Sequence, residues 1–252
     1  MSCIHQIWIG SHPIPRIWTQ TINDFAKEHN IPYRMWREAD LKRELDWDAF
    51  PGLWDLYLRT ERLSGKSNIA RYLMLYQCGG VYIDCDCVIV KPVEFAEFLK
   101  ENAANAWMAK EALPAVHRRR MTHSKDEHPD LFRRKNIVAN SILGAPVEHG
   151  FWKHVLEDII SYAAHLEGRG SWRETGPGFL ANMVSKYGNS YKTLKVFPMK
   201  KFYPVHWIGI KDPEAHLKRP VGESMFFQYG YSTNGFDKIL ARHTRRKRKR
   251  DI

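Results

Sequence analysis

Hydrophobic positions along the chain follow two spacings in turn, and this alternation predicts strands separated by helices. Short apolar runs bounded by Gly, Pro or polar clusters are typical of strands, whereas apolar residues that recur every three or four positions are typical of helices. We expect strands at 4–9, 32–36, 80–90, 106–110, 137–143 and 195–197, and helices at 17 onward, 38–46, 50–63, 67–78, 93–101, 149–166 and 177–187. This order favours an α/β fold with a mostly parallel central sheet flanked by helices.

Two carboxylates, Asp84 and Asp86, stand in the apolar stretch Gly-Gly-Val-Tyr-Ile-Asp-Cys-Asp-Cys-Val-Ile-Val. Side chains alternate along an extended strand, so we expect both carboxylates on one face and Cys85 and Cys87 on the other. Neighbouring carboxylates raise each other's pKa unless a cation lies between them, and a hard divalent cation takes oxygen ligands and commonly holds phosphates as well. The alternative is a strand end whose aspartates reach water or cap a turn.

The segment before this strand predicts a helix that starts with Ser67 or Asn68 as its N-cap and stops at Gly79 and Gly80. Asn68 and Arg71 are three positions apart and therefore share one helical face. An amide suits a sugar hydroxyl and a guanidinium suits a phosphate, so this helix would bring both groups beside the carboxylates. A solvated or ion-paired arginine is the simpler alternative.

The run from 67 to 86 resembles the Asp-x-Asp sugar-binding region of a glycosyltransferase family that includes yeast initiating mannosyltransferases and large clostridial glucosylating toxins. The opening run 4–10, Ile-His-Gln-Ile-Trp-Ile-Gly, is similar to that family's first strand. Weaker similarities extend over most of residues 4–234, and they are Asn140, Thr175-Gly176-Pro177 and Phe202-Tyr203-Pro204.

The resemblance implies a GT-A fold and the transfer of a sugar, with retention of anomeric configuration, from a UDP- or GDP-linked donor to a glycan or another hydroxyl acceptor. It implies Mn²⁺ or Mg²⁺ as the cofactor. The residues to which it assigns donor-binding roles are Trp8, Ile9, Asn68, Arg71, Tyr82 and Asp84.

Individual roles follow from the same resemblance. Trp8 would stack on the nucleotide base, and Tyr82 would contact the nucleotide or a phosphate. Asp86 would ligate the metal directly, and Asn140 would touch the donor sugar near the reacting carbon. The residues implied to take part in catalysis are Asp84, Asp86, Arg71 and Asn140.

The chain departs from the family's pattern in two places. The family usually has aspartate where this chain has Asn68, which removes one charge from the sugar contact. Many members place a histidine and a tryptophan-containing segment near the C-terminus, where this chain reads Gln-Tyr-Gly-Tyr-Ser-Thr-Asn over 228–234. The metal ligands expected here are Asp86 and Asp84, with Gln228 as a candidate third ligand because an amide oxygen is an acceptable hard ligand.

A retaining enzyme can let the departing phosphate oxygen take the acceptor proton, whereas an inverting enzyme needs a carboxylate base. If the configuration were inverted, Glu174, Asp212 and Glu223 would be base candidates, and the sequence does not rank them.

The net charge of +11 is concentrated at the C-terminus, where seven of the 39 Lys and Arg residues lie in 242–250. We expect one glycosyltransferase domain over 1–241 and a disordered basic tail over 242–252. Such a tail could contact an anionic membrane or another polyanion, act as a nuclear address, or have no role. A second basic stretch, 117–136, is expected to be a long loop.

The sequence shows no apolar run long enough for a membrane span and no secretory leader. We therefore expect a cytoplasmic protein, in which only the tail would contact a membrane surface. We also expect a bacterial or viral origin, because eukaryotic members of the similar family usually carry a Golgi anchor. Four cysteines form no disulfide framework. Cys85 and Cys87 lack a second pair at zinc-ligand spacing and are interpreted as core residues.

Two other functions are alternatives to glycosyl transfer. A nucleic-acid-binding protein could use the basic tail and loop, but no known nucleic-acid motif is present. A metal-dependent phosphohydrolase could use Asp84 and Asp86, but further ligands for two metals are not evident.

Overall fold

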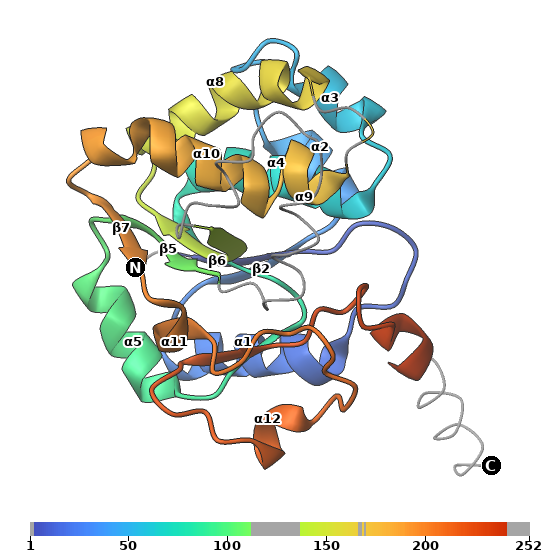
Figure 1. Ribbon diagram of the computed structural model, residues 1–252, viewed down its shortest axis with the longest axis vertical. Helices are drawn as coiled ribbons and strands as arrows, with labels where there is room; N and C mark the ends of the chain where they lie inside the picture. The colour runs from blue at the N-terminus through green and yellow to red at the C-terminus, as the bar shows by residue number, and fades with distance from the viewer. Residues whose placement is uncertain (1–2, 112–136, 166–167, 169, 241–252) are drawn as a thin grey trace, which may run out of the picture.

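The computed structural model describes residues 3–111, 137–165, 168 and 170–240. Its centre is a six-stranded sheet in the order β2-β1-β3-β6-β5-β7 (Figure 1). The strands are β1 (Ile4–Ile7), β2 (Tyr33–Trp36), β3 (Gly80–Ile83), β5 (Ala106–Lys110), β6 (Val138–Ala145) and β7 (Leu194–Phe197). A separate antiparallel pair consists of β4 (Cys87–Ile89) and β8 (Phe226–Gln228).

The sheet confirms the α/β class but is mixed. Three of its five pairings are parallel, and β6 runs antiparallel to both β3 and β5. As a result the carboxyl ends of β1, β3 and β5 meet the start of β6 at one edge of the sheet. Open α/β sheets bind their ligands at this edge.

Helices cover both faces of the sheet (Figure 1). One face carries α2 (Glu38–Glu44), α3 (Leu53–Arg59), α4 (Leu63–Cys78), α8 (Gly150–His165), α9 (Ser171–Glu174) and α10 (Pro177–Tyr187). The other face carries α1 (Arg16–Glu28), α5 (Pro92–Glu101), α11 (Met199–Phe202) and α12 (Ala215–Lys218). A short 3₁₀ turn, η1, spans Gly188–Ser190.

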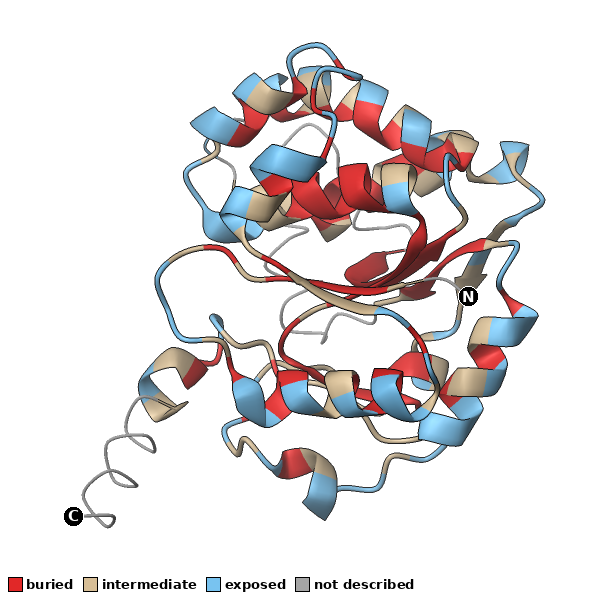
Figure 2. Cartoon of the chain, turned by 180° about the vertical axis from the view of Figure 1, so that it is seen from behind, coloured by how far each residue is buried: buried red, intermediate tan, exposed pale blue. Residues whose placement is uncertain are grey.

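Each helical layer has its own hydrophobic core against the sheet. Buried residues such as Leu73, Trp152 and Phe179 fill the α4–α8–α10 side, and Ile22 and Phe95 fill the α1–α5 side. Figure 2 shows buried residues on the inward sides of the helices and exposed residues on the outward sides. This arrangement is the one that helical apolar spacing predicts.

A third, smaller core attaches the C-terminal part of the described chain to α1. The Trp18 ring stacks on Tyr229 with 4.6 Å between centroids, and its indole N–H donates to the Pro213 carbonyl at 3.0 Å. Phe236 contacts both aromatic rings edge-on. These contacts hold the segment after β8 beside the carboxyl ends of β1 and β3.

The sequence-based boundaries were wrong at two places near this edge. The single strand expected over 80–90 is divided into β3 and β4, and Asp84, Cys85 and Asp86 lie in the connection between them. Helix α4 begins at Leu63 with Arg62 as its N-cap, so Ser67 and Asn68 lie inside the helix. Asn68 bonds to Thr175 and Asn140 in other parts of the fold, and these tertiary contacts override its capping preference. The Ser67 hydroxyl accepts from Arg71 within the same helix.

The helix stop at Gly79 and Gly80 is confirmed. Both residues have positive φ, at 63° and 88°, a region that glycine enters without strain. A Cβ on Gly80 would also lie 2.3 Å from the carbonyl oxygen of Cys3, so the close approach of β3 to the start of the chain requires glycine here.

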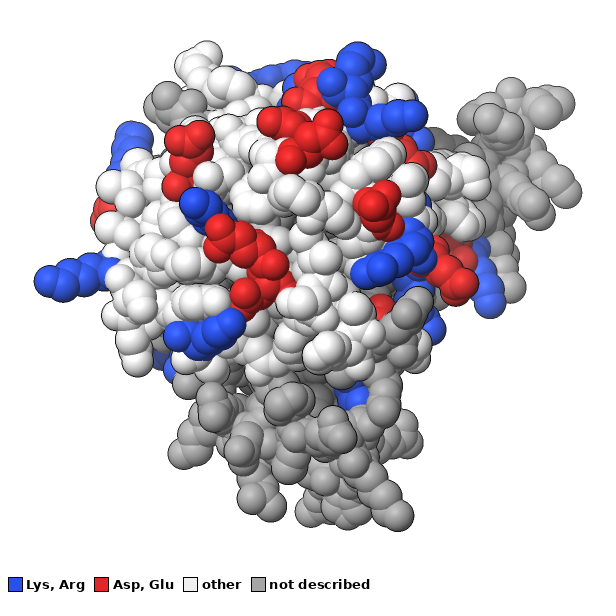
Figure 3. Space-filling view, turned by 90° about the horizontal axis from the view of Figure 1, so that it is seen from above, with Lys and Arg blue, Asp and Glu red and all other residues white. Residues whose placement is uncertain are grey.

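Helices α9, α11 and α12 and strand β8 were not predicted from the sequence, whereas the helices expected at 93–101, 149–166 and 177–187 correspond to α5, α8 and α10. Among the residues that the structure describes, no helix combines the length and apolar character needed to cross a bilayer. The basic tail at 242–252 and the basic stretch at 117–136 lie outside the described residues. Viewed from the side of α8, basic and acidic side chains lie among one another (Figure 3).

Candidate active site

A pocket of about 230 Å³ lies at the edge of the sheet where β1, β3 and β5 end. Its walls come from α4, the β3–β4 connection, the start of β6, the region of α9 and α10, and the segment after β8. The predicted site residues that line it are Asn68, Arg71, Asp84, Asp86, Asn140 and Gln228. Residues distant in the sequence are thus brought together by strand order.

Asp84 follows directly after β3 and is held on both its backbone and its side chain. Its backbone N–H donates to the Ser141 carbonyl at 2.7 Å. Its Oδ1 accepts from the Tyr82 hydroxyl at 2.6 Å and lies 3.2 Å from Nη2 of Arg71. Burial raises the pKa of Asp84, while the Arg71 charge and the Tyr82 hydroxyl act in the opposite direction. The carboxylate is therefore positioned by one cation and one hydroxyl.

Asp86 is more deeply buried, with 9% of its surface exposed. Its Oδ2 accepts from the backbone N–H of Tyr231 at 2.6 Å, and its carbonyl accepts from the N–H of Tyr229 at 3.0 Å. Burial and the nearby Asp84 charge raise the pKa of Asp86 to about 7, against the opposing Tyr231 N–H. A carboxylate in these surroundings is stabilised by a bound cation, which would replace its proton.

The two carboxylates converge for a different reason from the one predicted. They do not share a strand face, because a turn closed by the Cys87 N–H and the Asp84 carbonyl, at 3.1 Å, separates β3 from β4. Cys85 Sγ lies 3.4 Å from the Ile7 carbonyl, while Cys87 belongs to the core on the α1–α5 side. Burial raises the pKa of both thiols. The cysteines therefore pack in separate surroundings, as core residues.

The elevated pKa of Asp86 makes its effect on stability depend on pH. Between about pH 4 and pH 7 this group binds more protons in the folded than in the unfolded state, so its contribution to the free energy of unfolding falls as the pH rises. Asp86→Asn keeps an oxygen for the Tyr231 N–H and should stabilise the metal-free protein at pH 8 by about 2 to 4 kcal/mol, with little gain near pH 4. Urea unfolding in EDTA across this range measures the difference.

The matched control is Asp212→Asn, since the pairing with Lys218 lowers the pKa of that carboxyl. It should give no such gain at high pH. If Asp86→Asn changed the free energy of unfolding equally at all pH values, the raised pKa of Asp86 would be contradicted.

Arg71 is buried and connects three elements of the site. Its Nη1 donates to the Asn140 carbonyl at 2.5 Å, and its Nη2 donates to the Ser67 hydroxyl at 3.1 Å. The guanidinium also lies over the Tyr82 ring, 4.3 Å from the centroid. Burial acts to lower the pKa of Arg71, but the charge of Asp84 and neighbouring groups outweigh it and the pKa is raised. Arg71 is therefore not solvated, but it is ion-paired with Asp84, as the alternative reading allowed.

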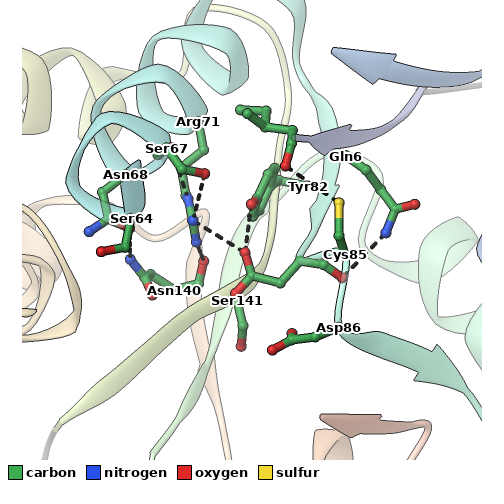
Figure 4. Close-up of polar contacts among 12 residues, drawn as sticks. Gln6, Ser64, Ser67, Asn68, Arg71, Tyr82, Cys85, Asp86, Asn140 and Ser141 are labelled. Carbon is green, nitrogen blue, oxygen red and sulfur yellow. Dashed lines mark hydrogen bonds and ion pairs between the residues drawn. The ribbon is translucent and has the colours of Figure 1, made fainter. Parts of the chain in front are cut away.

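Asn68 and Arg71 face the site from one side of α4, as their spacing predicts, and Figure 4 shows both of them beside Asn140. Asn140 Nδ2 donates to Asn68 Oδ1 at 2.9 Å. Asn68 Nδ2 in turn lies within 3.2 Å of Thr175 Oγ1 and 3.4 Å of the Ser171 carbonyl. The amide thus accepts on one side and donates on the other, which a carboxylate cannot do.

This arrangement gives a prediction for Asn68→Asp, the change that restores the family's usual residue. A carboxylate would lose the bond to the Ser171 carbonyl and set two acceptors against each other in a buried place, at a cost of about 1 to 3 kcal/mol in stability. Chemical unfolding measures this cost, and activity with a panel of nucleotide sugars should show a changed ranking of donors. Unchanged stability and an unchanged ranking would contradict the role given to the amide.

The remaining predicted donor-binding residues lie around the pocket in different ways. Trp8 follows β1, donates its indole N–H to the His12 carbonyl at 2.7 Å, and meets the pocket-lining Tyr231 edge-on at 5.3 Å. Ile9 is buried in the core. Tyr82 is 1% exposed, so its hydroxyl reaches the pocket through Asp84.

Gln228 ends β8 opposite Cys87, and its Oε1 accepts from the Ser141 hydroxyl at 3.2 Å. No three His, Cys, Asp or Glu side chains of the described chain are grouped so that they could hold a metal ion. The two aspartates and this amide are oxygen donors that line the same pocket. They are hard ligands that fit Mn²⁺ or Mg²⁺, with coordination completed by phosphate and water oxygens.

The carboxylates named as base candidates do not line the pocket as the structure describes it. Glu174 accepts from the Gly170 N–H at 2.8 Å, Asp212 pairs with Lys218, and Glu223 pairs with Lys200. The carboxylate that sequence reasoning missed is Glu111, which lines the pocket at the end of β5. Its position just after a strand was the signal that could have indicated it.

Comparison with known proteins gives a family match over part of the chain. Residues 15–113 match the family described as the glycosyltransferase sugar-binding region containing the DXD motif. Over 95 residues the chain is 26% identical to inositol phosphoceramide mannosyltransferase 1 of Schizosaccharomyces pombe. That alignment covers 36% of this chain and 29% of the relative, so it spans less than a third of the relative's length.

Solved structures show the same fold at low identity. The PaToxG glycosyltransferase has a TM-score of 0.52 and 16% identity, covering 75% of this chain and 69% of that one. The bifunctional glycosyltransferase WbbM in its apo form has a TM-score of 0.51 and 12% identity, with 91% and 45% covered. Apo mouse xyloside xylosyltransferase 1 has a TM-score of 0.50 and 9% identity, with 92% and 98% covered.

The chain has the fold of solved GT-A glycosyltransferases. Over residues 15–113 it matches the sugar-binding region of the DXD family, which confirms the resemblance seen in the sequence.

Proposed function

We propose that the protein transfers a hexose or a related sugar from a UDP- or GDP-linked donor to a hydroxyl of a glycan or glycoconjugate, with retention of configuration and with a divalent metal. The observation that carries this proposal is the convergence of Asp84, Asp86 and Arg71 in one pocket at the carboxyl ends of the strands. The two carboxylates suit a cation and the buried guanidinium suits a diphosphate, and a cation and a diphosphate bind each other.

In this proposal Asp86, Asp84 and Gln228 hold the metal, which when bound would neutralise charge on the leaving diphosphate. Arg71 stabilises negative charge that develops as the glycosidic bond breaks, because its guanidinium is fixed by Ser67 and Asn140 before the donor arrives. Asn68 and Asn140 orient the donor sugar through their linked amides.

Retention rests on the resemblance to the DXD family. Of the carboxylates that line the pocket, Glu111 was not among the earlier base candidates. Glu174, Asp212 and Glu223 are engaged elsewhere, so none of them faces a donor in this pocket. NMR analysis of the anomeric configuration of the first-formed product tests this part of the proposal.

The function itself is tested with a panel of UDP- and GDP-linked sugars and Mn²⁺, with release of UDP or GDP as the readout. At least one donor should release its nucleotide, and EDTA should suppress the release. Release from no donor, or release unaffected by EDTA, would overturn the proposal. The nucleic-acid alternative finds no support in the matches, and a phosphohydrolase would release phosphate instead of a nucleoside diphosphate.

Trp8→Ala tests the expected stacking on the nucleotide base. Loss of the ring should weaken binding of UDP or GDP by about 1 to 3 kcal/mol, as for other aromatic–base stacks. Isothermal titration calorimetry with Mn²⁺ present measures the change. Trp8→Phe keeps a ring and should recover part of the affinity, whereas equal affinity for all three proteins would contradict the role.

A further inference from the structure

Glu111 lines the pocket, and neither the motif nor the proposed chemistry uses it. Its backbone N–H donates to the Ile137 carbonyl at 2.8 Å and extends the pairing of β5 with β6 past Lys110. The side chain is 10% exposed, so its carboxyl group is largely buried at the edge of the sheet where the site lies.

One oxygen of this carboxylate is held and the other is not. Glu111 Oε1 lies 3.2 Å from Nε2 of His206, whose side chain is 9% exposed. Glu111 Oε2 is buried and has no hydrogen-bond partner in the part of the chain that the structure describes. An unpaired buried oxygen is costly, and a ligand that supplies a hydroxyl would satisfy it.

An aromatic ring stands beside this pair. Trp207 follows His206 and lines the same pocket. Its ring lies against Gly230, where a Cβ would come within 2.4 Å of the indole, so the glycine makes room for the ring. The Trp207 carbonyl accepts from Asn234 Nδ2 at 2.7 Å, which fixes the backbone. An apolar ring next to a hydrogen-bonding carboxylate suits a sugar, which presents C–H faces and hydroxyls together.

The order of strands separates this place from the donor's nucleotide. Trp8 follows β1 and Glu111 follows β5. Three steps from strand to neighbouring strand separate them, by way of Asp84 after β3 and Asn140 in β6. At about 4.8 Å a step, the span is roughly 14 Å. Within the described residues, Glu111 and His206 do not combine with Asp84 or Asp86 into a group that could hold a metal ion. If Trp8 stacks on the base, as expected, the two residues lie past Asn140 on the side of the sheet away from the nucleotide.

We propose that Glu111, held by His206 and flanked by Trp207, is a specificity-determining residue that binds a hydroxyl of an acceptor sugar. Its Oε2 accepts the hydrogen bond, and no proton is transferred to it. This inference rests on the proposed glycosyl transfer and deepens it, because it assigns the acceptor's subsite.

The test separates the acceptor from the donor. Glu111→Gln and His206→Gln are compared with the wild-type protein using the nucleotide sugar that it hydrolyses and a panel of methyl glycosides as acceptors. Glu111→Gln should raise the KM for the glycoside about tenfold or more, with kcat within about threefold. His206→Gln should act in the same direction more weakly. Donor hydrolysis without acceptor and the Kd for UDP or GDP should stay within about twofold.

Glu223→Gln, a surface carboxylate paired with Lys200, is the matched control and should change none of these quantities. Equal loss of hydrolysis and transfer would assign Glu111 to the donor, and a kcat lower by more than a hundredfold at unchanged KM would make it a proton acceptor. Either result, or no change at all, overturns the inference. A wild-type protein that hydrolyses a donor but uses no glycoside also overturns it, whereas one that hydrolyses no donor overturns the proposed function.

Discussion

Asp86→Ala should reduce sugar transfer and donor hydrolysis by about a thousandfold or more, the largest effect expected of any single substitution in this protein. The variant removes the most buried carboxylate of the site, and with it the expected anchor of the metal that neutralises the leaving diphosphate. A thousandfold loss corresponds to about 4 kcal/mol in the barrier, which is reasonable for an electrostatic contact in a site protected from water.

The fold should survive this change, since a buried carboxylate with a raised pKa opposes folding at neutral pH. Nucleotide release and calorimetric titration with Mn²⁺ measure activity and metal affinity, and circular dichroism checks the fold. Asp55→Ala, on the exposed side of α3, is the control and should behave as wild type. Full activity of the Asp86 variant, or of the wild type in EDTA, would contradict the proposal that Asp86 binds a metal needed for transfer.

Arg71→Met is the second large effect. Removing the guanidinium leaves Asp84 buried without its cation and leaves the Asn140 carbonyl and the Ser67 hydroxyl without their donor. Breaking a buried ion pair from one side typically costs about 3 to 5 kcal/mol of stability. Transfer should also fall by at least about a hundredfold, because a fixed charge at the leaving group is lost.

Denaturant unfolding and nucleotide release measure the two losses of Arg71→Met independently. Arg71→Lys serves as the comparison, since a lysine keeps the charge but cannot reproduce the planar set of donors. It should recover part of the stability and less of the activity. A Met variant as active as the wild type would remove Arg71 from the proposed mechanism.

The sequence predicted the local parts of the site and missed the non-local ones. Asn68 and Arg71 were placed on one face correctly, because helical spacing is set within a single turn. The break at Asp84–Asp86 was missed, because bonds from Tyr229 and Tyr231, far along the chain, hold Asp86 there. An apolar run alone cannot reveal a turn whose partners lie elsewhere.

The same reasoning explains the mixed sheet and the missed carboxylate. Alternation of strands and helices favours parallel pairing, but the direction of β6 depends on the connection after Glu111, whose pattern indicates only a loop. Glu111 carried no motif, and its importance follows from His206 and Trp207, which approach it from much later in the sequence. Strand ends are therefore worth inspecting even where no motif is present.

The attachment of the segment after β8 to α1 has a consequence for dividing the protein into fragments. Trp18 stacked on Tyr229 holds the backbone that donates to Asp86, so α1, near the start of the chain, supports the proposed metal ligand from behind. The family-matched region 15–113 contains both aspartates but neither Asn140 nor Tyr231. Expressed alone, it would carry the motif without these groups and without β1, the strand between β2 and β3. Restoring the site in trans would take a fragment that includes β1 together with one that contains 137–240.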